Sequence, residues 1–278
     1  MIIFTLLFCT VLLGNSILFG SPRLLLNMKI KKPRTTQINL DRIILKAKTT
    51  NQYNYVDALH NDFVQLLVVD GPAGSGKTFL GCLKAIDLLH KKQVDKIVIT
   101  RPAVTVKENI GFLPGSIVDK MDPWTKPIFD IFLDYYSVLD IDNMLNNNII
   151  EICPIAFMRG RTFKNAIIIA DEMQNSNPNQ MKMLTTRVGN NCKLIVTGDS
   201  TQSDININNG FSDIIPKINT YTKFNPMNEN NHLVKIIQMN TTDIQRSNLT
   251  KHIINVYDYK PRAIKELKKI DFDAAYTR

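Results

Sequence analysis

The stretch at residues 71–78 is Gly-Pro-Ala-Gly-Ser-Gly-Lys-Thr, which matches the pattern GxxxxGK(S/T) in full. Just before it, residues 64–69 are apolar and rich in valine and leucine, which predicts a strand. Residues 77–89 then carry leucine and isoleucine at helical spacing. A glycine-rich loop between a strand and a helix is the context in which this pattern binds phosphate. The stretch therefore predicts an α/β fold with an anion-binding loop.

The residue types of this loop suit the phosphates of a nucleotide. Glycines let the backbone wrap so that its N–H groups point inward, and the N-terminus of the following helix adds partial positive charge. Lys77 would reach the β- and γ-phosphates, and Thr78 would offer its hydroxyl to Mg²⁺. The residues expected to bind the nucleotide are Gly71, Pro72, Ala73, Gly74, Ser75, Gly76, Lys77 and Thr78.

Strands and helices are expected to alternate along the rest of the chain. Further apolar runs predict strands at 96–100, 149–153, 166–170, 193–197 and 233–238. The predicted helices cover 126–139, 178–188, 249–257 and 262–269, and a polar, asparagine-rich stretch at 206–231 interrupts the pattern. This alternation predicts a mostly parallel sheet flanked by helices.

A pair of acids follows the apolar run at 166–170, whose continuous hydrophobicity predicts a central strand covered on both faces. Asp171 would hold Mg²⁺, which prefers oxygen ligands, and Glu172 would polarise an attacking water. An acidic pair after a strand can also be a solvated helix start. The phosphate-binding loop earlier in the chain favours the functional interpretation, because the two roles depend on each other.

A polar segment at residues 197–202 follows the next predicted strand. Ligands of open α/β folds bind at the carboxyl ends of the strands, where this segment is expected to lie. Gln202 and Asp199 are the two candidates for sensing a γ-phosphate. An ordinary surface loop remains the alternative interpretation.

The charge of the chain is concentrated near its N-terminus. The 278 residues carry a formal net charge of +9, and residues 1–50 hold eight basic residues and one acid. The remainder is therefore only about +2. Hydrophobic residues make up 44%, which excludes wholesale disorder, and the four dispersed cysteines, with no CxxC pair, argue against a zinc knuckle or a disulfide scaffold.

The first segment of the chain allows several interpretations. Residues 1–22 contain no charged side chain and approach the length that crosses a bilayer, and a basic lead-in follows at 23–47. The segment is a signal peptide or organelle-targeting leader, a membrane anchor with the folded body on the cytoplasmic side, or an extension ahead of a start at Met28. We expect the folded body itself to be cytoplasmic.

Several uncommon motifs occur together and in order, and they resemble the PhoH family of P-loop ATPases over residues 48–258, with a helical tail at 259–278. The motifs lie at 48–52, 71–78, 100–104, 111–115, 158–162, 171–175 and 196–202. The resemblance implies a RecA-like core that binds ATP and Mg²⁺ and hydrolyses ATP. It further implies RNA as a partner and assembly into a homo-oligomeric ring.

The resemblance also assigns roles to single residues. Gln52 matches an upstream glutamine that contacts adenine, and Arg246 matches a late arginine that contacts the γ-phosphate. An arginine suits the charge that develops on a transferring phosphoryl group, although an exposed ion-pairing arginine is the plainer interpretation. Arg159 and Arg161 are alternatives, within one chain or across a subunit interface. The expected catalytic set is thus Lys77, Glu172, Gln202 and Arg246.

The chain also departs from its relatives. Some members of the family carry an N-terminal PIN nuclease domain, whereas here only some 47 residues with one acid precede the match, so ribonuclease activity is not expected. Met173 stands where alanine is usual.

Two other functions use the same loop, a small-molecule kinase and a non-catalytic nucleotide-binding module tethered to a membrane. The nearly neutral body shows no RNA-recognition motif.

Overall fold

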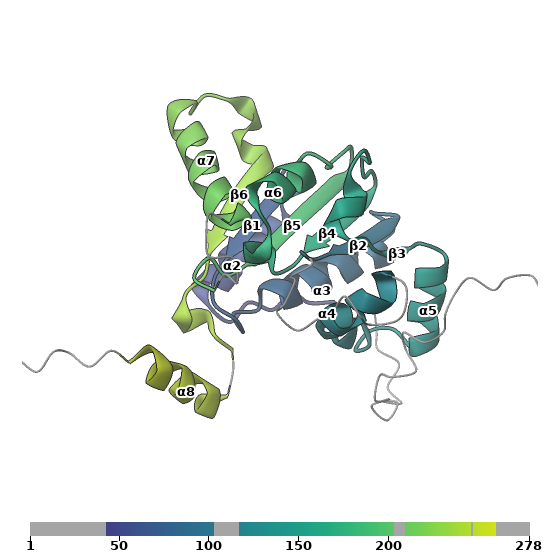
Figure 1. Cartoon of the computed structure of the whole chain (residues 1–278), viewed down its shortest axis with the longest axis horizontal. Helices are drawn as coiled ribbons and strands as arrows, with labels where there is room; N and C mark the ends of the chain where they lie inside the picture. The colour runs from purple at the N-terminus through teal and green to yellow at the C-terminus, as the bar shows by residue number, and fades with distance from the viewer. Residues whose placement is uncertain (1–42, 103–116, 203–208, 246, 260–278) are drawn as a thin grey trace, which may run out of the picture.

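The computed structural model describes residues 43–102, 117–202, 209–245 and 247–259. Its centre is a six-stranded sheet, all parallel, with the strand order β3-β2-β4-β5-β1-β6 (Figure 1). The strands are β1 (Leu66–Asp70), β2 (Lys96–Thr100), β3 (Ile150–Ile152), β4 (Ala166–Ala170), β5 (Cys192–Gly198) and β6 (Val234–Gln238). The α/β class and the parallel sheet expected from the sequence are confirmed.

The sheet is buried on both faces, and alternate residues of each strand point into different core layers. In β1, Leu67 and Val69 belong to one layer and Val68 to the other. Every residue of β4 and of β5 is buried. This double burial explains why both strands are continuous apolar runs in the sequence.

Helices cover each face of the sheet (Figure 1). One core layer packs against α2 (Thr50–His60), α3 (Lys77–His90), α4 (Ile117–Phe132) and α5 (Val138–Asn146). The other packs against α6 (Pro178–Thr185), α7 (Gly210–Phe224) and the 3₁₀ turns η3 (Ile155–Met158) and η4 (Met173–Asn175). The remaining described elements are η5 (Glu229–Leu233), η6 (Thr241–Asp243) and α8 (Asn248–Asp258).

The helices differ from the sequence prediction in several places. The helix predicted at 126–139 is two helices, because Ser137 starts α5 with a capping box to Asp140. The helix after Asn177 ends at Thr185 and not at residue 188. At this end the hydroxyl of Thr185 donates to Met181 O and that of Thr186 donates to Lys182 O. The asparagine-rich stretch at 206–231 contains α7, which was not predicted.

One further helix was not predicted, and two predicted segments lie outside the described residues. The helix α2 was not predicted either; Thr49 caps it by accepting a hydrogen bond from the Gln52 N–H. The predicted helix at 262–269 and the apolar segment at 1–22 lie outside the described residues. Among the described residues, the helices are too short or too polar for any of them to cross a bilayer.

Candidate functional site

The phosphate-binding loop lies at the carboxyl ends of β1, β5 and β6. The Gly71 N–H donates to Gly198 O at 3.1 Å, and the Met239 N–H donates to Asp70 O at 2.7 Å. A Cβ atom on Gly71 would lie 2.6 Å from the Met239 Cβ, so the packing of the loop requires glycine there. Gly76 is the N-cap that precedes α3, and its φ of 89° is a left-handed conformation that also favours glycine.

Lys77 is buried inside this loop. Its Nζ donates to the carbonyls of Gly71 at 2.6 Å and Pro72 at 2.8 Å. Burial lowers the pKa of this ammonium, and surrounding carboxylates oppose the shift: those of Asp199, Glu172, Asp171 and Asp70. The lysine therefore lies where phosphate oxygens would enter the loop, within a strongly acidic surrounding.

The hydroxyl of Thr78 and the carboxylate of Asp171 meet directly. Thr78 Oγ1 donates to Asp171 Oδ1 at 2.7 Å, and Thr197 Oγ1 donates to the same oxygen at 2.6 Å. Asp171 is buried, and its N–H donates to Thr100 O. The structure thus brings together the two residues predicted to hold Mg²⁺, and an all-oxygen pair of this kind suits that ion.

Glu172 has an unusual backbone for a non-glycine residue. Its φ is 54°, and its side chain accepts a hydrogen bond from Gln174 Nε2 at 2.6 Å. Arg101 Nη2 lies 3.6 Å from the Glu172 carboxylate, which is 40% exposed. Left-handed conformations of this kind cost of order 1–3 kcal/mol and are concentrated at functional sites. The carboxylate is therefore held in position and remains accessible to water.

Asp199 follows β5 and is buried beside the loop. Its Oδ1 accepts from Thr201 N at 3.0 Å and from Thr201 Oγ1 at 2.6 Å. Its Oδ2 is buried with no hydrogen-bond partner in the described part of the chain, which marks it as a group able to bind a ligand, water or ion. Gln202, the other candidate for sensing phosphate, is exposed, and its N–H donates to Asp199 O.

Gln52 is buried against the underside of the loop. Its Nε2 donates to Ser75 O at 2.9 Å and to Asp243 O at 3.3 Å, while its Oε1 accepts from Lys48 N at 2.8 Å. The side chain therefore pins the phosphate-binding loop to two neighbouring segments. Its predicted contact with adenine stays a prediction.

Asp243 belongs to this site, although the sequence did not single it out. It is fully buried and accepts hydrogen bonds from Thr49 Oγ1, from Asn51 Nδ2 at 2.9 Å and from Asn240 N at 2.8 Å. The Gln245 N–H donates to Gly74 O at 2.9 Å. The capping-box pattern at 240–243 was a local signal, but only the fold shows that this turn contacts the loop.

The predicted arginines are not brought to the loop by any contact between described residues. Arg246 lies outside the described residues. Arg159 is exposed after η3, whereas the Arg161 guanidinium binds Glu151, with Nη2 to Oε2 at 3.1 Å. Met173 is fully buried in the core layer that packs against α6 and α7.

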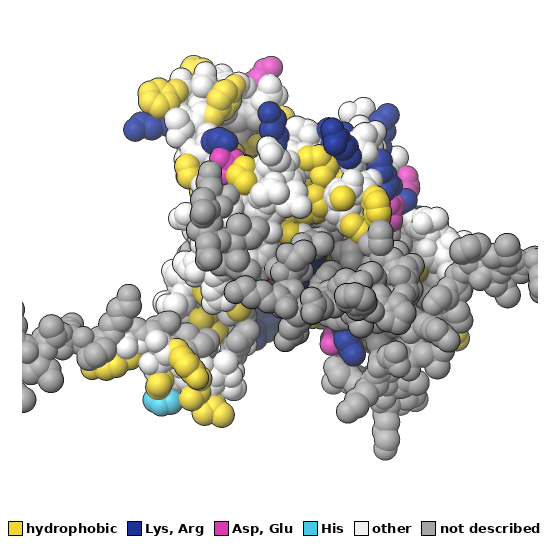
Figure 2. Space-filling view, viewed as in Figure 1, with side chains coloured by type: hydrophobic (Ala, Val, Ile, Leu, Met, Phe, Trp, Pro, Cys, Tyr) yellow, Lys and Arg dark blue, Asp and Glu magenta, His cyan; other side chains and the backbone are white. Residues whose placement is uncertain are grey.

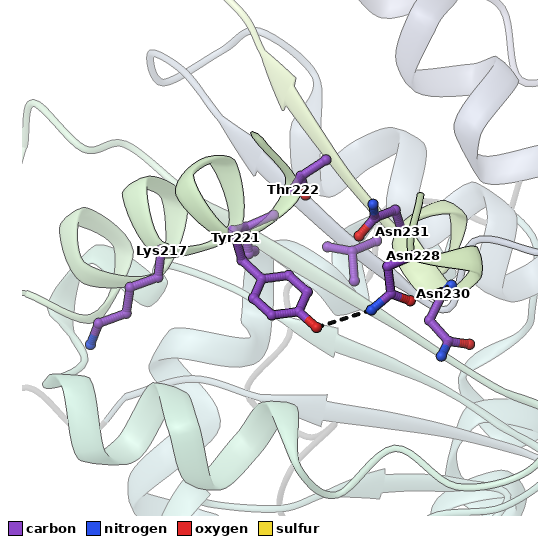
Figure 3. A pocket seen from close by; sticks show the side chains of 8 residues that line it. Lys217, Tyr221, Thr222, Asn228, Asn230 and Asn231 are labelled. Carbon is purple, nitrogen blue, oxygen red and sulfur yellow. Dashed lines mark hydrogen bonds between the residues drawn. The ribbon is translucent and has the colours of Figure 1, made fainter. Parts of the chain in front are cut away.

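A separate open groove of about 380 Å³ lies between α7 and η5 (Figure 3). Asparagine side chains from 228–231 line it together with Tyr221, whose hydroxyl accepts from Asn228 Nδ2 at 3.0 Å. No residue of the phosphate-binding loop contributes to its lining. The asparagine-rich stretch therefore builds its own surface, apart from the nucleotide site.

The parallel sheet and the loop between β1 and α3, with a strand-end aspartate bound to its threonine, define a protein with a P-loop NTPase core. The chain belongs to the PhoH family: the family model described as PhoH-like protein matches residues 44–258. This match agrees with the resemblance seen in the sequence motifs.

Curated relatives carry the same name. A PhoH-like protein of Bacillus subtilis is 38% identical over 217 residues, which cover 77% of this chain and 64% of the relative. A PhoH-like protein of Mycobacterium tuberculosis is 37% identical over 218 residues, covering 77% and 58%. Protein PhoH of Escherichia coli K12 is 36% identical over 215 residues, covering 76% and 57%. The matched region thus spans about three fifths of each relative's length.

Proposed function

We propose that this protein hydrolyses ATP to ADP and phosphate in the presence of Mg²⁺. The single observation that carries the proposal is the hydrogen bond between Thr78 Oγ1 and Asp171 Oδ1. It joins two motifs that lie far apart in the sequence at the one edge of the sheet where a phosphate would enter. The buried Lys77 and the exposed carboxylate of Glu172 flank the same place.

Each side chain then has a distinct task. The loop N–H groups and Lys77 bind the β- and γ-phosphates, and Thr78 with Asp171 would hold Mg²⁺, which neutralises charge on the phosphate oxygens when bound. Glu172 accepts a proton from, or orients, the water that attacks the γ-phosphate. Asp199, through its unpartnered Oδ2, and Gln202 contact the attacking water or the γ-phosphate. Arg246 supplies positive charge to the transferring group.

The proposal extends to partners. ATP hydrolysis is coupled to binding or remodelling of RNA, and the chain works as a homo-oligomeric ring, with membrane contact through residues 1–22 as a further element. The support is the family membership, because the resemblance to the PhoH family implies RNA as a partner and assembly into a ring. Two measurements test it: the rate of ATP hydrolysis with and without RNA, and the molar mass in solution by light scattering.

The decisive experiment compares the parent with Lys77→Ala. Loss of one preorganised charge at a phosphoryl-transfer site lowers kcat by about 100- to 1000-fold, so phosphate release by this variant should fall to near background. Lys126→Ala, which removes an exposed lysine on α4, is the matched control and should keep the parent rate. Equal hydrolysis by the parent and Lys77→Ala would show that the site is wrongly assigned.

The products separate hydrolysis from phosphoryl transfer. A hydrolase releases one phosphate for each ADP in the absence of any acceptor, whereas a small-molecule kinase forms ADP only with its acceptor present. Measuring both products on the same sample decides between these reactions. ADP formation without free phosphate would overturn the proposed hydrolysis.

A further inference from the structure

Two long stretches of this chain contain no acidic residue. They are residues 152–170 and 173–198, on either side of the Asp171–Glu172 pair. Between them they carry six basic residues: Arg159, Arg161, Lys164, Lys182, Arg187 and Lys193. Lys193 is buried in β5. The other five cations are concentrated in a body whose total charge is close to neutral.

The fold joins these two stretches side by side. The Phe163 N–H donates to Arg187 O at 2.9 Å, and the Gly189 N–H donates to Phe163 O at 2.9 Å. Arg187 Nη1 donates to Arg161 O at 3.2 Å. We call this surface the cationic face; its residues are Arg159, Arg161, Lys164, Lys182 and Arg187. Figure 2 shows Lys and Arg side chains gathered at the upper right of the molecule, with few acidic ones among them.

The cations of this face differ in how they are held. Arg159, Lys164 and Lys182 are exposed and form no ion pair within the described part of the chain. Arg161 is fixed by its two bonds to Glu151 and by its position 4.6 Å above the Phe163 ring. Arg187 is fixed by donating to Met183 O at 3.2 Å. The face therefore combines three exposed cations that form no ion pair in the described part of the chain with two guanidinium groups held by hydrogen bonds.

We propose that the cationic face binds the phosphodiester backbone of single-stranded RNA. Exposed Lys and Arg side chains attract phosphates and release their counterions, and guanidinium groups match phosphate oxygens in pairs. Phe157, 54% exposed on η3 beside Arg159, offers a ring on which an unpaired base can stack. The choice of RNA over other polyanions rests on the proposed function.

The face is separate from the nucleotide site. Its loops at 159–165 and 186–191 lead into the first residues of β4 and β5, which pair at Ala166 and Cys192. The phosphate-binding loop lies at the opposite, carboxyl edge of the same sheet. RNA on the cationic face would therefore leave the nucleotide loop free to bind ATP.

The test measures the fluorescence anisotropy of a labelled single-stranded oligouridylate with the full chain. The variant is the double Lys164→Ala, Lys182→Ala, and the matched control is Lys126→Ala, Lys235→Ala, which removes two exposed lysines on α4 and β6. We expect about five-fold or greater weakening in the first double variant at low salt, and less than two-fold in the control. The slope of log affinity against log salt should fall by roughly 1.4, about 0.7 for each lost phosphate contact.

Cross-linking adds an independent readout. RNA containing 4-thiouridine should cross-link to peptides from 157–164 and 182–187, and the double variant should lose these products. Cross-links confined to residues 1–50, equal weakening in both double variants, or no RNA binding by the parent would each overturn the proposal. So would binding to anionic lipid vesicles without binding to RNA.

Phosphate release without RNA is measured on the same preparations. The double variant should keep the parent rate, because neither lysine touches the nucleotide loop. A protein that hydrolyses ATP but fails the RNA test refutes the cationic face alone. A protein that binds RNA through the face, with equal phosphate release by the parent and Lys77→Ala, refutes the proposed ATPase site alone.

Discussion

The nucleotide edge of the sheet and the cationic face have opposite charge. Four carboxylates surround Lys77 at the edge, those of Asp70, Asp171, Glu172 and Asp199. Five cations form the face, and Glu151 is the acid bound among them. An acidic edge repels a triphosphate unless a divalent cation accompanies it, whereas the face needs no cation to attract phosphates. The comparison shows that a near-zero sum of charges conceals two surfaces with different ligand requirements.

The two regions also differ in burial. Side chains of the nucleotide edge are mostly buried and bonded to one another, so the loss of one leaves its partners unsatisfied. Three cations of the face are exposed and independent, so their effects should be small and additive. Single substitutions at the edge should therefore have larger effects than single substitutions on the face.

The largest expected effect is that of Glu172→Gln. Removing the general base should lower kcat for ATP hydrolysis by about 100- to 10,000-fold, while a fluorescent ATP analogue should bind with nearly parent affinity because the loop is intact. Glu229→Gln, an exposed substitution on η5, is the control. A kcat within two- to three-fold of the parent would remove Glu172 from the mechanism.

Asp243→Asn should have the next largest effect. The amide would turn an N–H₂ group toward donors that now bond to the carboxylate, lowering the free energy of unfolding by about 2–3 kcal/mol. Urea unfolding followed by circular dichroism measures this, with the exposed Asp130→Asn on α4 as control. Equal stability of the two variants would show that the Asp243 bonds do not anchor the loop.

Salt concentration should affect ligand binding at the two regions differently. Raising salt from about 50 to 200 mM should weaken RNA binding about 2.6-fold for each phosphate contact, or roughly 100-fold when all five cations of the face contact phosphates, because exposed charges are screened and counterion release is less favourable. The KM for ATP should change by less than about two-fold, since the loop and Lys77 are buried. Titrations at both salt concentrations test this, and equal sensitivity of the two ligands would contradict the separation of the sites.

The smallest effect concerns Glu151, the acid that binds Arg161 of the face. The hydrogen bond from Arg161 lowers the pKa of Glu151 to about 2, against burial and with help from Lys96. Because the folded-state pKa lies below the unfolded value, this stabilisation is complete above about pH 4.5 and is lost as pH falls toward 2.

The matching variant is Glu151→Gln. It should be less stable than the parent by about 1 kcal/mol at pH 7, and the difference should narrow between pH 4.5 and 2, as measured by urea unfolding at several pH values. A difference that grows on acidification would reverse the assigned sign.

Much of the fold followed from local sequence patterns. The strands were predicted because β4 and β5 are buried on both faces and are therefore continuously apolar. Helix α7 was missed because it lies in an asparagine-rich stretch and contains Pro216, which usually interrupts a helix. Its cap at Asn209 gave a weak signal among many asparagines. The break before α5 was missed because apolar residues continue through it.

The part of the site that lies in local sequence motifs was predicted, and the part that depends on distant residues was not. Lys77, Thr78 and Asp171 lie in motifs whose spacing from a strand end is itself the signal, and the structure brings them together. The hydrogen bond from Gln52 Nε2 to Asp243 O joins residues almost two hundred positions apart, so no local pattern predicts it. Asp243 was recognised as part of the site only because the structure buries it next to the phosphate-binding loop.

The sequence by itself determined the phosphate-binding loop, the strand-end acids and the net charge, because each depends on residue types at short spacing. The tertiary structure alone decided which charges are neighbours. Pairing of β4 with β5 placed two acid-free stretches side by side, while pairing of β1 with β5 placed the acids around Lys77. Electrostatic interactions depend on distance in space and on burial, and strand order sets both.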